Sequence, residues 1–222
     1  MTPLRMTELE FGSLLSYSPR GNSSGASHSR NVMIALKTEK FVRDTSGKTL
    51  PMSEWVAEKI QQDREKLEFS SFFNPTTMLV PTPKSSLMQP GTLWVPERVA
   101  SALVEKKLGK RVQPCLTRVR PVPKAATSSP SERPTPLDHY NSLRVIGTLT
   151  KPEEIILVDD IITRGATLLG AANRLAEAFP ETRIRAFAVM RTISKSNEFE
   201  QLNDPCVGII TLRNSGDSIR RP

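Results

Sequence analysis

The chain has 222 residues, of which 37% are hydrophobic and 24% are charged, so it can bury a sizeable core, and neither full-length disorder nor a fibrous repeat fits. Its formal net charge is +8, from 31 Lys and Arg against 23 Asp and Glu. Two cysteines and two histidines are too few for a disulfide framework or a multi-histidine metal cage. No apolar run approaches a bilayer span, and residues 1–15 lack the apolar stretch of a signal peptide. We therefore expect one domain over residues 1–222, in the cytoplasm and without a membrane segment.

Apolar periodicity predicts short strands alternating with amphipathic helices. Residues 18–30 are rich in Gly and Ser and predict a mobile segment, and the apolar run 31–37 fits either a strand or a helix end. The later expected elements are a helix after Pro51, a strand at 78–80, a helix at 96–109 ended by Gly109, a strand at 155–158, a helix at 166–179, and strands at 184–190 and 207–212. This alternation predicts an α/β fold, with a central parallel sheet flanked by helices and a core over about residues 31–212.

Most of the positive charge lies in one proline-rich stretch. Residues 105–133 contain eight Lys and Arg against two Asp and Glu, so they carry +6 of the total. Prolines remove backbone donors and disfavour helix before them, so a long loop is expected, and loops of this length are commonly lids or binding loops. Net charge alone leaves three partners open: nucleic acid, a membrane surface or a phosphorylated small molecule.

The strongest functional signal is the segment 155–168, IILVDDIITRGATL. Four apolar residues form a strand, and Asp159 and Asp160 follow; neighbouring strand residues point to opposite sides, so both cannot face the core. Two carboxylates at a strand end are costly unless they meet a ligand, a cation or water. The loop 163–167 then enters a helix N-terminus, where free N–H groups favour an anion. Acids before an anion site indicate a sugar phosphate, and a response-regulator-like or generic metal site is the alternative.

Residues 155–167 resemble the phosphoribosyl pyrophosphate (PRPP) motif of type I phosphoribosyltransferases at every position. The resemblance implies that Asp159 and Asp160 hold the ribose 2- and 3-hydroxyls, directly or through water bound to Mg²⁺. It also implies that a loop holds the 5-phosphate; we call it the phosphate loop, and it consists of Thr163, Arg164, Gly165, Ala166 and Thr167. The arginine in this loop is typical of amidophosphoribosyltransferase-like members.

An earlier strand end, the segment 78–86 (MLVPTPKSS), resembles the pyrophosphate loop of ComF-like phosphoribosyltransferases. The resemblance implies that Lys84 and Ser85 contact the pyrophosphate and that Lys84 assists its departure; a proline-stiffened surface turn is the alternative. The order of the next segments is also similar to ComF-like proteins, so residues 118–136 are expected to be a mobile lid. Its candidate pyrophosphate contacts are Arg118, Arg120, Lys124 and Arg133, for each of which a solvated surface charge is the alternative.

These resemblances imply a magnesium-dependent enzyme that displaces pyrophosphate from PRPP with a nitrogenous base or amine, using Asp159, Asp160 and Lys84 as catalytic residues. They also imply a homodimer and a small hood, built from residues 11–40 and 195–220, that selects the acceptor. The rival hypothesis is a non-catalytic protein of the same fold that senses PRPP or a nucleotide and binds nucleic acid, in DNA uptake or regulation. One PRPP cannot contact the whole basic cluster of Lys106, Lys107, Lys110 and Arg111, so the sequence gives that cluster no role.

Overall fold

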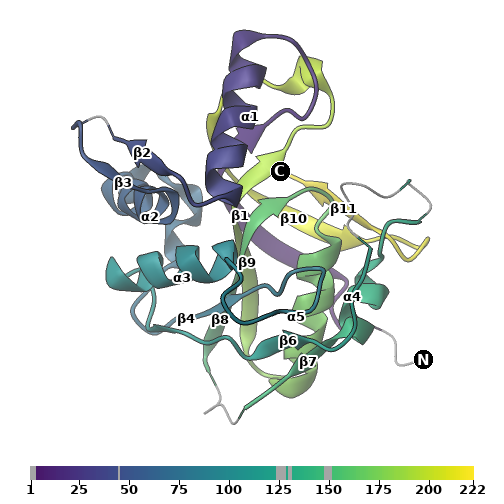
Figure 1. Ribbon diagram of the computed structural model, residues 1–222. Coiled ribbons are helices and arrows are strands. Elements are labelled where there is room, and N and C mark those ends of the chain that lie inside the picture. The colour runs from purple at the N-terminus through teal and green to yellow at the C-terminus, as the bar shows by residue number, and fades with distance from the viewer. Residues whose placement is uncertain (1–3, 45, 124–128, 130–131, 148–151) are drawn as a thin grey trace.

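The computed structural model describes residues 4–44, 46–123, 129, 132–147 and 152–222. Its centre is a seven-stranded sheet in the order β11-β10-β1-β9-β8-β4-β5, with helices on both faces (Figure 1). These strands are β1 (Glu8–Tyr17), β4 (Met78–Pro81), β5 (Arg111–Val112), β8 (Glu154–Ile162), β9 (Arg183–Thr192), β10 (Asn203–Leu212) and β11 (Ser218–Arg221). All pairs from β1 to β5 are parallel, and β10 and β11 continue the sheet as an antiparallel hairpin. The expected α/β architecture with a mostly parallel central sheet is confirmed.

The remaining elements surround this sheet. The helices are α1 (Ser24–Lys37), α2 (Met52–Gln62), α3 (Val95–Glu105), α4 (Pro136–Ser142) and α5 (Ala166–Ala178), with short 3₁₀ turns at Arg64–Lys66, Glu68–Phe72 and Ser196–Glu198. Two small antiparallel ribbons pair β2 (Phe41–Arg43) with β3 (Thr49–Pro51) and β6 (Leu116–Arg118) with β7 (Leu143–Val145). Within the described part of the chain, no helix is both long and apolar enough to cross a membrane.

Strand β8 divides the core into two layers. Ile155 and Leu157 pack in the layer that contains α5, whereas Ile156 and Val158 pack in the layer that contains α1, α2 and α3. All four side chains are fully buried, and each contributes roughly 1.5–3 kcal/mol of hydrophobic stabilisation. Because side chains alternate along a strand, the next two residues, Asp159 and Asp160, belong to opposite faces of the sheet.

The chain ends contribute more to the sheet than the sequence predicted. Strand β1, which was not expected, lies between β9 and β10, and residues 213–217 form the turn from β10 into β11. Gly12, Ser13 and Ser16 interrupt the apolar alternation of β1, although both serines are fully buried. The sheet therefore extends beyond residues 31–212 at both ends. Of the segments expected to form a hood, α1 and the neighbouring segment 193–202 stand above the carboxyl edge of the sheet (Figure 1).

The expected loose segment 18–30 is helical from Ser24 onward, and this corrects the prediction. Its serines cap and brace the helix instead of loosening it. The Ser23 side chain accepts from the Ala26 N–H at 3.1 Å, and the Ser29 hydroxyl donates to the Ala26 carbonyl at 2.8 Å. Such an N-cap satisfies a backbone donor that the first turn leaves free. The run 31–37 is accordingly the second half of α1, not a strand.

Helix α3 ends earlier than predicted, and Gly109 does not end it. The left-handed residue after the helix is Lys107, with φ 60°. Gly109 has a different reason to be glycine, because an added Cβ would lie 2.8 Å from Cγ of Leu79. Close approach between the loop before β5 and the strand β4 requires the missing side chain.

Candidate functional site

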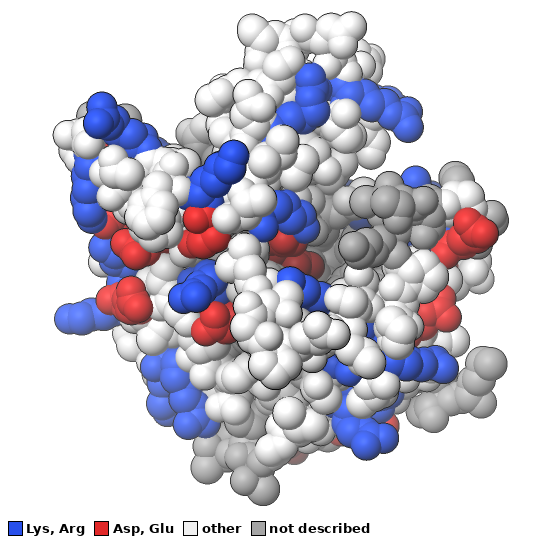
Figure 2. Space-filling view, in the orientation of Figure 1, with Lys and Arg blue, Asp and Glu red and all other residues white. Residues whose placement is uncertain are grey.

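A cavity of about 450 Å³ opens at the carboxyl edge of the sheet. Its lining includes Asp159 at the end of β8 and every residue of the phosphate loop. Tyr17 from β1, His139 from α4 and Thr192 from β9 complete the inner wall. Figure 2 shows this hollow below α1, with acidic atoms inside it and basic side chains beside them. The structure thus brings the first predicted acid and the predicted phosphate loop into one site.

The phosphate loop has a conformation that only glycine fits well. Gly165 is the N-cap of α5 and has φ 83°. A Cβ atom at this position would lie 2.6 Å from Cγ1 of Ile210 in β10. Any larger residue would be strained at this position, because of both the positive φ and the close contact. The loop therefore presents the free N–H groups of the first turn of α5 at the cavity, where they favour an anion.

The β10–β11 hairpin holds the phosphate loop from outside the cavity. Arg220 donates from Nε to the Thr163 carbonyl at 3.0 Å and from Nη2 to the Thr192 carbonyl at 2.8 Å. Arg164 forms an ion pair with Asp217. Arg164 therefore lines the cavity with its charge already partnered, and it ties the loop to the turn before β11. No signal in the sequence points to Arg220 or Asp217 as parts of the site.

His139 lies beneath the phosphate loop as an uncharged side chain. Its Nε2 atom is 3.3 Å from the Thr167 hydroxyl, and only 5% of the residue is exposed. Burial, assisted by the positive charges of Arg118 and Arg164, lowers the pKa of His139 to about 3. The imidazole is therefore neutral near pH 7 and orients the threonine without adding charge to the site.

The two acids of the motif have different surroundings. Asp159 faces the cavity, and burial, followed by the nearby charge of Asp160, raises its pKa. Asp160 is absent from the cavity lining. Its Oδ2 atom instead forms an ion pair with Nζ of Lys37 in α1, at 2.6 Å. Burial lowers the pKa of Lys37, but attraction to Asp160 outweighs burial, and the net shift is upward. The resemblance implied that both carboxylates hold the ribose hydroxyls, whereas in the structure Asp159 lines the cavity and Asp160 is paired with Lys37 of α1.

The described side chains of the cavity could supply a magnesium ion with one carboxylate ligand and no more. Among the described residues, no group of three or more His, Cys, Asp or Glu side chains gathers where it could hold a metal. One cavity-facing carboxylate, Asp159, suits an ion held mainly by ligand oxygens and water. The indirect metal role that the resemblance implied for Asp159 and Asp160 stays a prediction.

The loop that follows β4, residues 82–86, lies next to Asp159 but outside the cavity lining. Pro81, the last residue of β4, pairs with Val158. The Thr82 N–H donates to the Val158 carbonyl at 2.9 Å, so this loop begins beside Asp159. Trp94 donates from its indole to the Thr82 carbonyl at 2.7 Å, which fixes the start of this β4 loop. Its predicted pyrophosphate contacts, Lys84 and Ser85, are partly exposed at the same edge of the sheet.

Arg118 is a buried side chain beside the β4 loop. It is 4% exposed and donates to the Lys84 carbonyl and to the Ser142 hydroxyl. Burial lowers the pKa of Arg118 to about 10, while Asp159 opposes that shift. Arg118 therefore fixes the β4 loop from behind as a buried cation and is not a solvated surface charge, and its contact with pyrophosphate stays a prediction.

The two described ends of the expected lid lie next to the β4 loop and the cavity. The Val122 N–H donates to the Ser85 carbonyl at 2.9 Å, so the chain after β6 runs along the β4 loop. Arg133 lines the cavity from the other end of the segment, and Arg120 is exposed. Lys124 lies outside the described residues.

No protein-family model matches the chain, and no curated protein matches it. Among solved structures, the chain is similar to a hypoxanthine phosphoribosyltransferase from Staphylococcus aureus, at 12% identity over 67% of this chain and 68% of that chain, with a TM-score of 0.31. It is also similar to a glutamine mutant from an analysis of an invariant aspartic acid in HPRTs, at 13% identity over 84% of this chain and 93% of that chain, also with a TM-score of 0.31. Similarity at this TM-score carries no argument about function, so the geometry of the site has to support any proposal.

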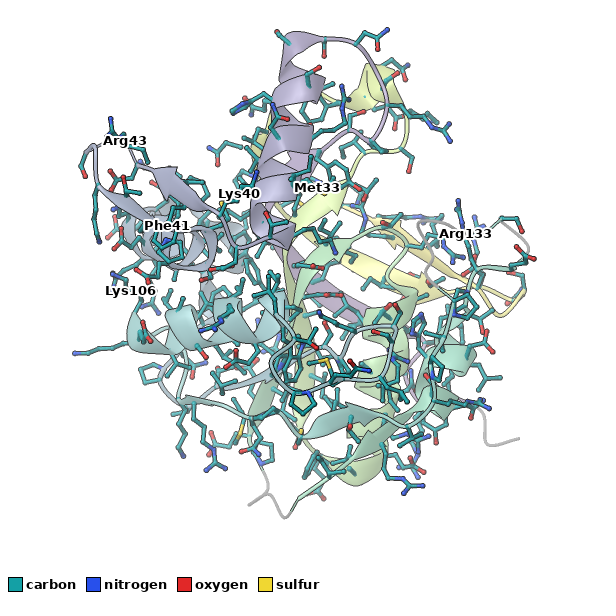
Figure 3. The ribbon with its side chains drawn as sticks, viewed as in Figure 1. Met33, Lys40, Phe41, Arg43, Lys106 and Arg133 are labelled. Atoms are coloured by element: carbon teal, nitrogen blue, oxygen red, sulfur yellow. The ribbon has the colours of Figure 1, made fainter. Side chains whose placement is uncertain are left out.

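The basic cluster lies away from the cavity. Lys106 forms an ion pair with Glu58 at 2.9 Å, and the other three side chains are exposed. Arg111 begins β5 and pairs with Met78, the first residue of β4, so the cluster lies at the amino edge of the sheet. Figure 3 shows Lys106 and Arg133 on opposite sides of the molecule. The cluster is therefore separate from the ligand site.

Proposed function

We propose that the chain is a type I phosphoribosyltransferase that binds PRPP and transfers its ribose 5-phosphate to a nitrogenous acceptor. The observation that carries this proposal is the cavity that Asp159 and the phosphate loop line together. A helix N-terminus with a left-handed glycine suits the 5-phosphate, and a carboxylate across the same cavity suits the ribose hydroxyls. The ComF-like branch remains a prediction from the motifs.

The proposed reaction forms a bond from the acceptor nitrogen to C1 of the ribose and breaks the bond from C1 to the pyrophosphate oxygen. Pyrophosphate leaves with the bonding electron pair, and the acceptor nitrogen loses its proton to solvent. Asp159 would accept hydrogen bonds from the ribose hydroxyls. The β4 loop, with Lys84, would face the leaving pyrophosphate. Magnesium would add positive charge on the pyrophosphate oxygens. Catalysis would then depend mainly on positioning and on electrostatic stabilisation of the leaving group.

Calorimetric titration with PRPP tests the proposal. Asp159→Asn should weaken binding by about tenfold or more, because a hydrogen bond to a charged group contributes roughly 1.5–3 kcal/mol. Glu105→Gln is the matched control, since Glu105 is exposed at the end of α3, and it should bind like the unsubstituted protein. Equal affinities for the two variants would remove Asp159 from the site. A screen of purine, pyrimidine and amine acceptors would then identify the nucleophile.

The rival hypothesis of nucleic-acid binding has one structural observation in its favour. Lys107, Lys110 and Arg111 are exposed together at the amino edge of the sheet. Binding through them should weaken steeply with salt and should survive Asp159→Asn. Salt-dependent binding to DNA or RNA that is lost in a triple Lys107→Gln, Lys110→Gln, Arg111→Gln variant would support this second function.

A further inference from the structure

Lys37 contacts the acidic motif, although nothing in the sequence links it to that motif. It ends α1, and its ammonium lies 2.6 Å from Oδ2 of Asp160, which is 123 residues away in the chain. Alternation along β8 explains the contact, because Asp160 points to the face of the sheet that α1 covers. The same alternation turns Asp159 to the cavity.

Asp160 uses both carboxylate oxygens within the protein. Its Oδ1 atom accepts the Ile161 N–H at 2.7 Å, and its Oδ2 atom accepts Lys37. The Asp160 side chain is only 14% exposed, so little of it is left for solvent or a ligand. A carboxylate in such surroundings needs a positive partner, and Lys37 supplies it.

The structure around Lys37 holds the ammonium in place. Leu36, the residue before it, is fully buried, and this anchors the last turn of α1 in the core. A helix C-terminus also favours a cation. Asp159 and Tyr17, which both line the cavity, lie close enough to Lys37 to act on its charge. The ammonium is therefore a fixed positive charge next to the cavity and the carboxylate pair.

We propose that Lys37 is the built-in cation of the acidic motif, which neutralises Asp160 in place of a divalent cation and so allows an anionic sugar diphosphate to bind beside Asp159 with little dependence on magnesium. Without Lys37, two carboxylates would repel the phosphates of the ligand, and the site would need an added cation. The ligand part of this proposal depends on the proposed PRPP binding, whereas the cation part does not.

The cation part is tested with magnesium alone. Melting temperatures are measured with MgCl₂ and with NaCl at equal ionic strength for the unsubstituted protein, Lys37→Met and the matched control Lys40→Met. Lys40 is exposed three residues after the end of α1 and forms no ion pair among the described residues; Figure 3 labels both Lys40 and Arg133, which lie well apart. We expect a magnesium-specific rise in Tm only for Lys37→Met, whose freed carboxylates would bind the ion. The same response in all three proteins would overturn the proposal.

The ligand part is tested by PRPP affinity in EDTA and in magnesium. In EDTA, Lys37→Met should bind about tenfold more weakly than the unsubstituted protein, which corresponds to the loss of one charge interaction near a protein surface. Magnesium should restore part of this loss. Lys37→Arg keeps the charge and should bind PRPP in EDTA almost as well as the unsubstituted protein. If Lys37→Met binds equally well in EDTA, the proposal is wrong.

The two experiments separate the failure of this proposal from the failure of the proposed function. If no protein binds PRPP under either condition, the proposed function fails, and the magnesium titration still decides whether Lys37 acts as the cation of the motif. Because removing Lys37 leaves the largely buried Asp160 carboxylate unpaired, each variant is first shown to melt cooperatively, and Lys37→Gln serves as a second neutral variant.

Discussion

Two neighbouring loops form the carboxyl edge of the sheet, and they are fixed in different ways. The phosphate loop after β8 has a left-handed Gly165, packs against Ile210 and lines the cavity. The β4 loop has no left-handed residue, lies outside the cavity lining and is held by the buried Arg118. Both loops are supported by an arginine from a distant segment, Arg220 for the phosphate loop and Arg118 for the β4 loop. Of the two, only the phosphate loop also depends on a left-handed glycine. The glycine leaves a signature in the sequence, whereas the arginines do not.

The largest effect should come from Gly165→Ala, which attacks the backbone of the phosphate loop. The strained φ and the overlap with Ile210 together should cost about 2–4 kcal/mol of unfolding free energy. Gly216→Ala is the matched control, because Gly216 also has a positive φ, 84°, but an added Cβ meets nothing within 4 Å. Urea denaturation measures both. Equal costs would show that contact with the β10–β11 hairpin does not restrict the loop.

Arg118→Met should release the β4 loop and cost about 2–3 kcal/mol, because hydrogen bonds from a charged donor are lost in a buried position. Pyrophosphate affinity should fall more than ribose 5-phosphate affinity, as measured by calorimetry. Arg120→Met, at an exposed position two residues later, should change neither. A similar loss for both ligands would contradict the division of roles between the two loops.

His139, which contacts the phosphate loop through Thr167, makes stability depend on pH. Its folded-state pKa of about 3 lies below the value near 6.5 of an exposed histidine, so the unfolded chain takes up the proton first. His139 should therefore contribute a loss of stability of about 1–2 kcal/mol between pH 7 and pH 5. The raised pKa of Asp159 acts in the opposite direction over the same range, so the contribution of His139 is read from the difference between variants. In denaturation at both pH values, His139→Gln should lose less stability than the unsubstituted protein, whereas His28→Gln should behave like the unsubstituted protein, since His28 is exposed on α1. The same pH dependence in His139→Gln and in the unsubstituted protein would contradict the neutral state.

The smallest effect should come from Arg220→Met, which removes the external support of the phosphate loop but leaves Gly165 in place. Ribose 5-phosphate binding should weaken by about fivefold, or roughly 1 kcal/mol, since two hydrogen bonds to loop and strand carbonyls are lost. Arg221→Met is the control, because Arg221 is exposed next to it. An unchanged affinity in Arg220→Met would show that the loop holds its shape without the hairpin.

Much of the fold was predictable where local patterns are strong. The strand at 155–158, the helix at 166–179 and the strand at 184–190 correspond to β8, α5 and β9. Strand β1 was missed because Gly12 and its buried serines interrupt the apolar pattern, and its burial depends on neighbours from both ends of the chain. The serines before residue 30 predicted a loose segment, although Ser23 is a helix cap. Capping and looseness use the same residue types, so composition cannot separate them.

By itself, the sequence determined the order of strand, acids, glycine loop and helix from Ile155 to Leu168, because each of these signals acts within a few residues of the chain. Only the tertiary structure decided how the charges of the site are shared. It joined Lys37 to Asp160, Arg118 to the β4 loop and Arg220 to the phosphate loop. These partners are 123, 34 and 57 residues apart, and such pairings follow from strand order and from which face of the sheet each helix covers.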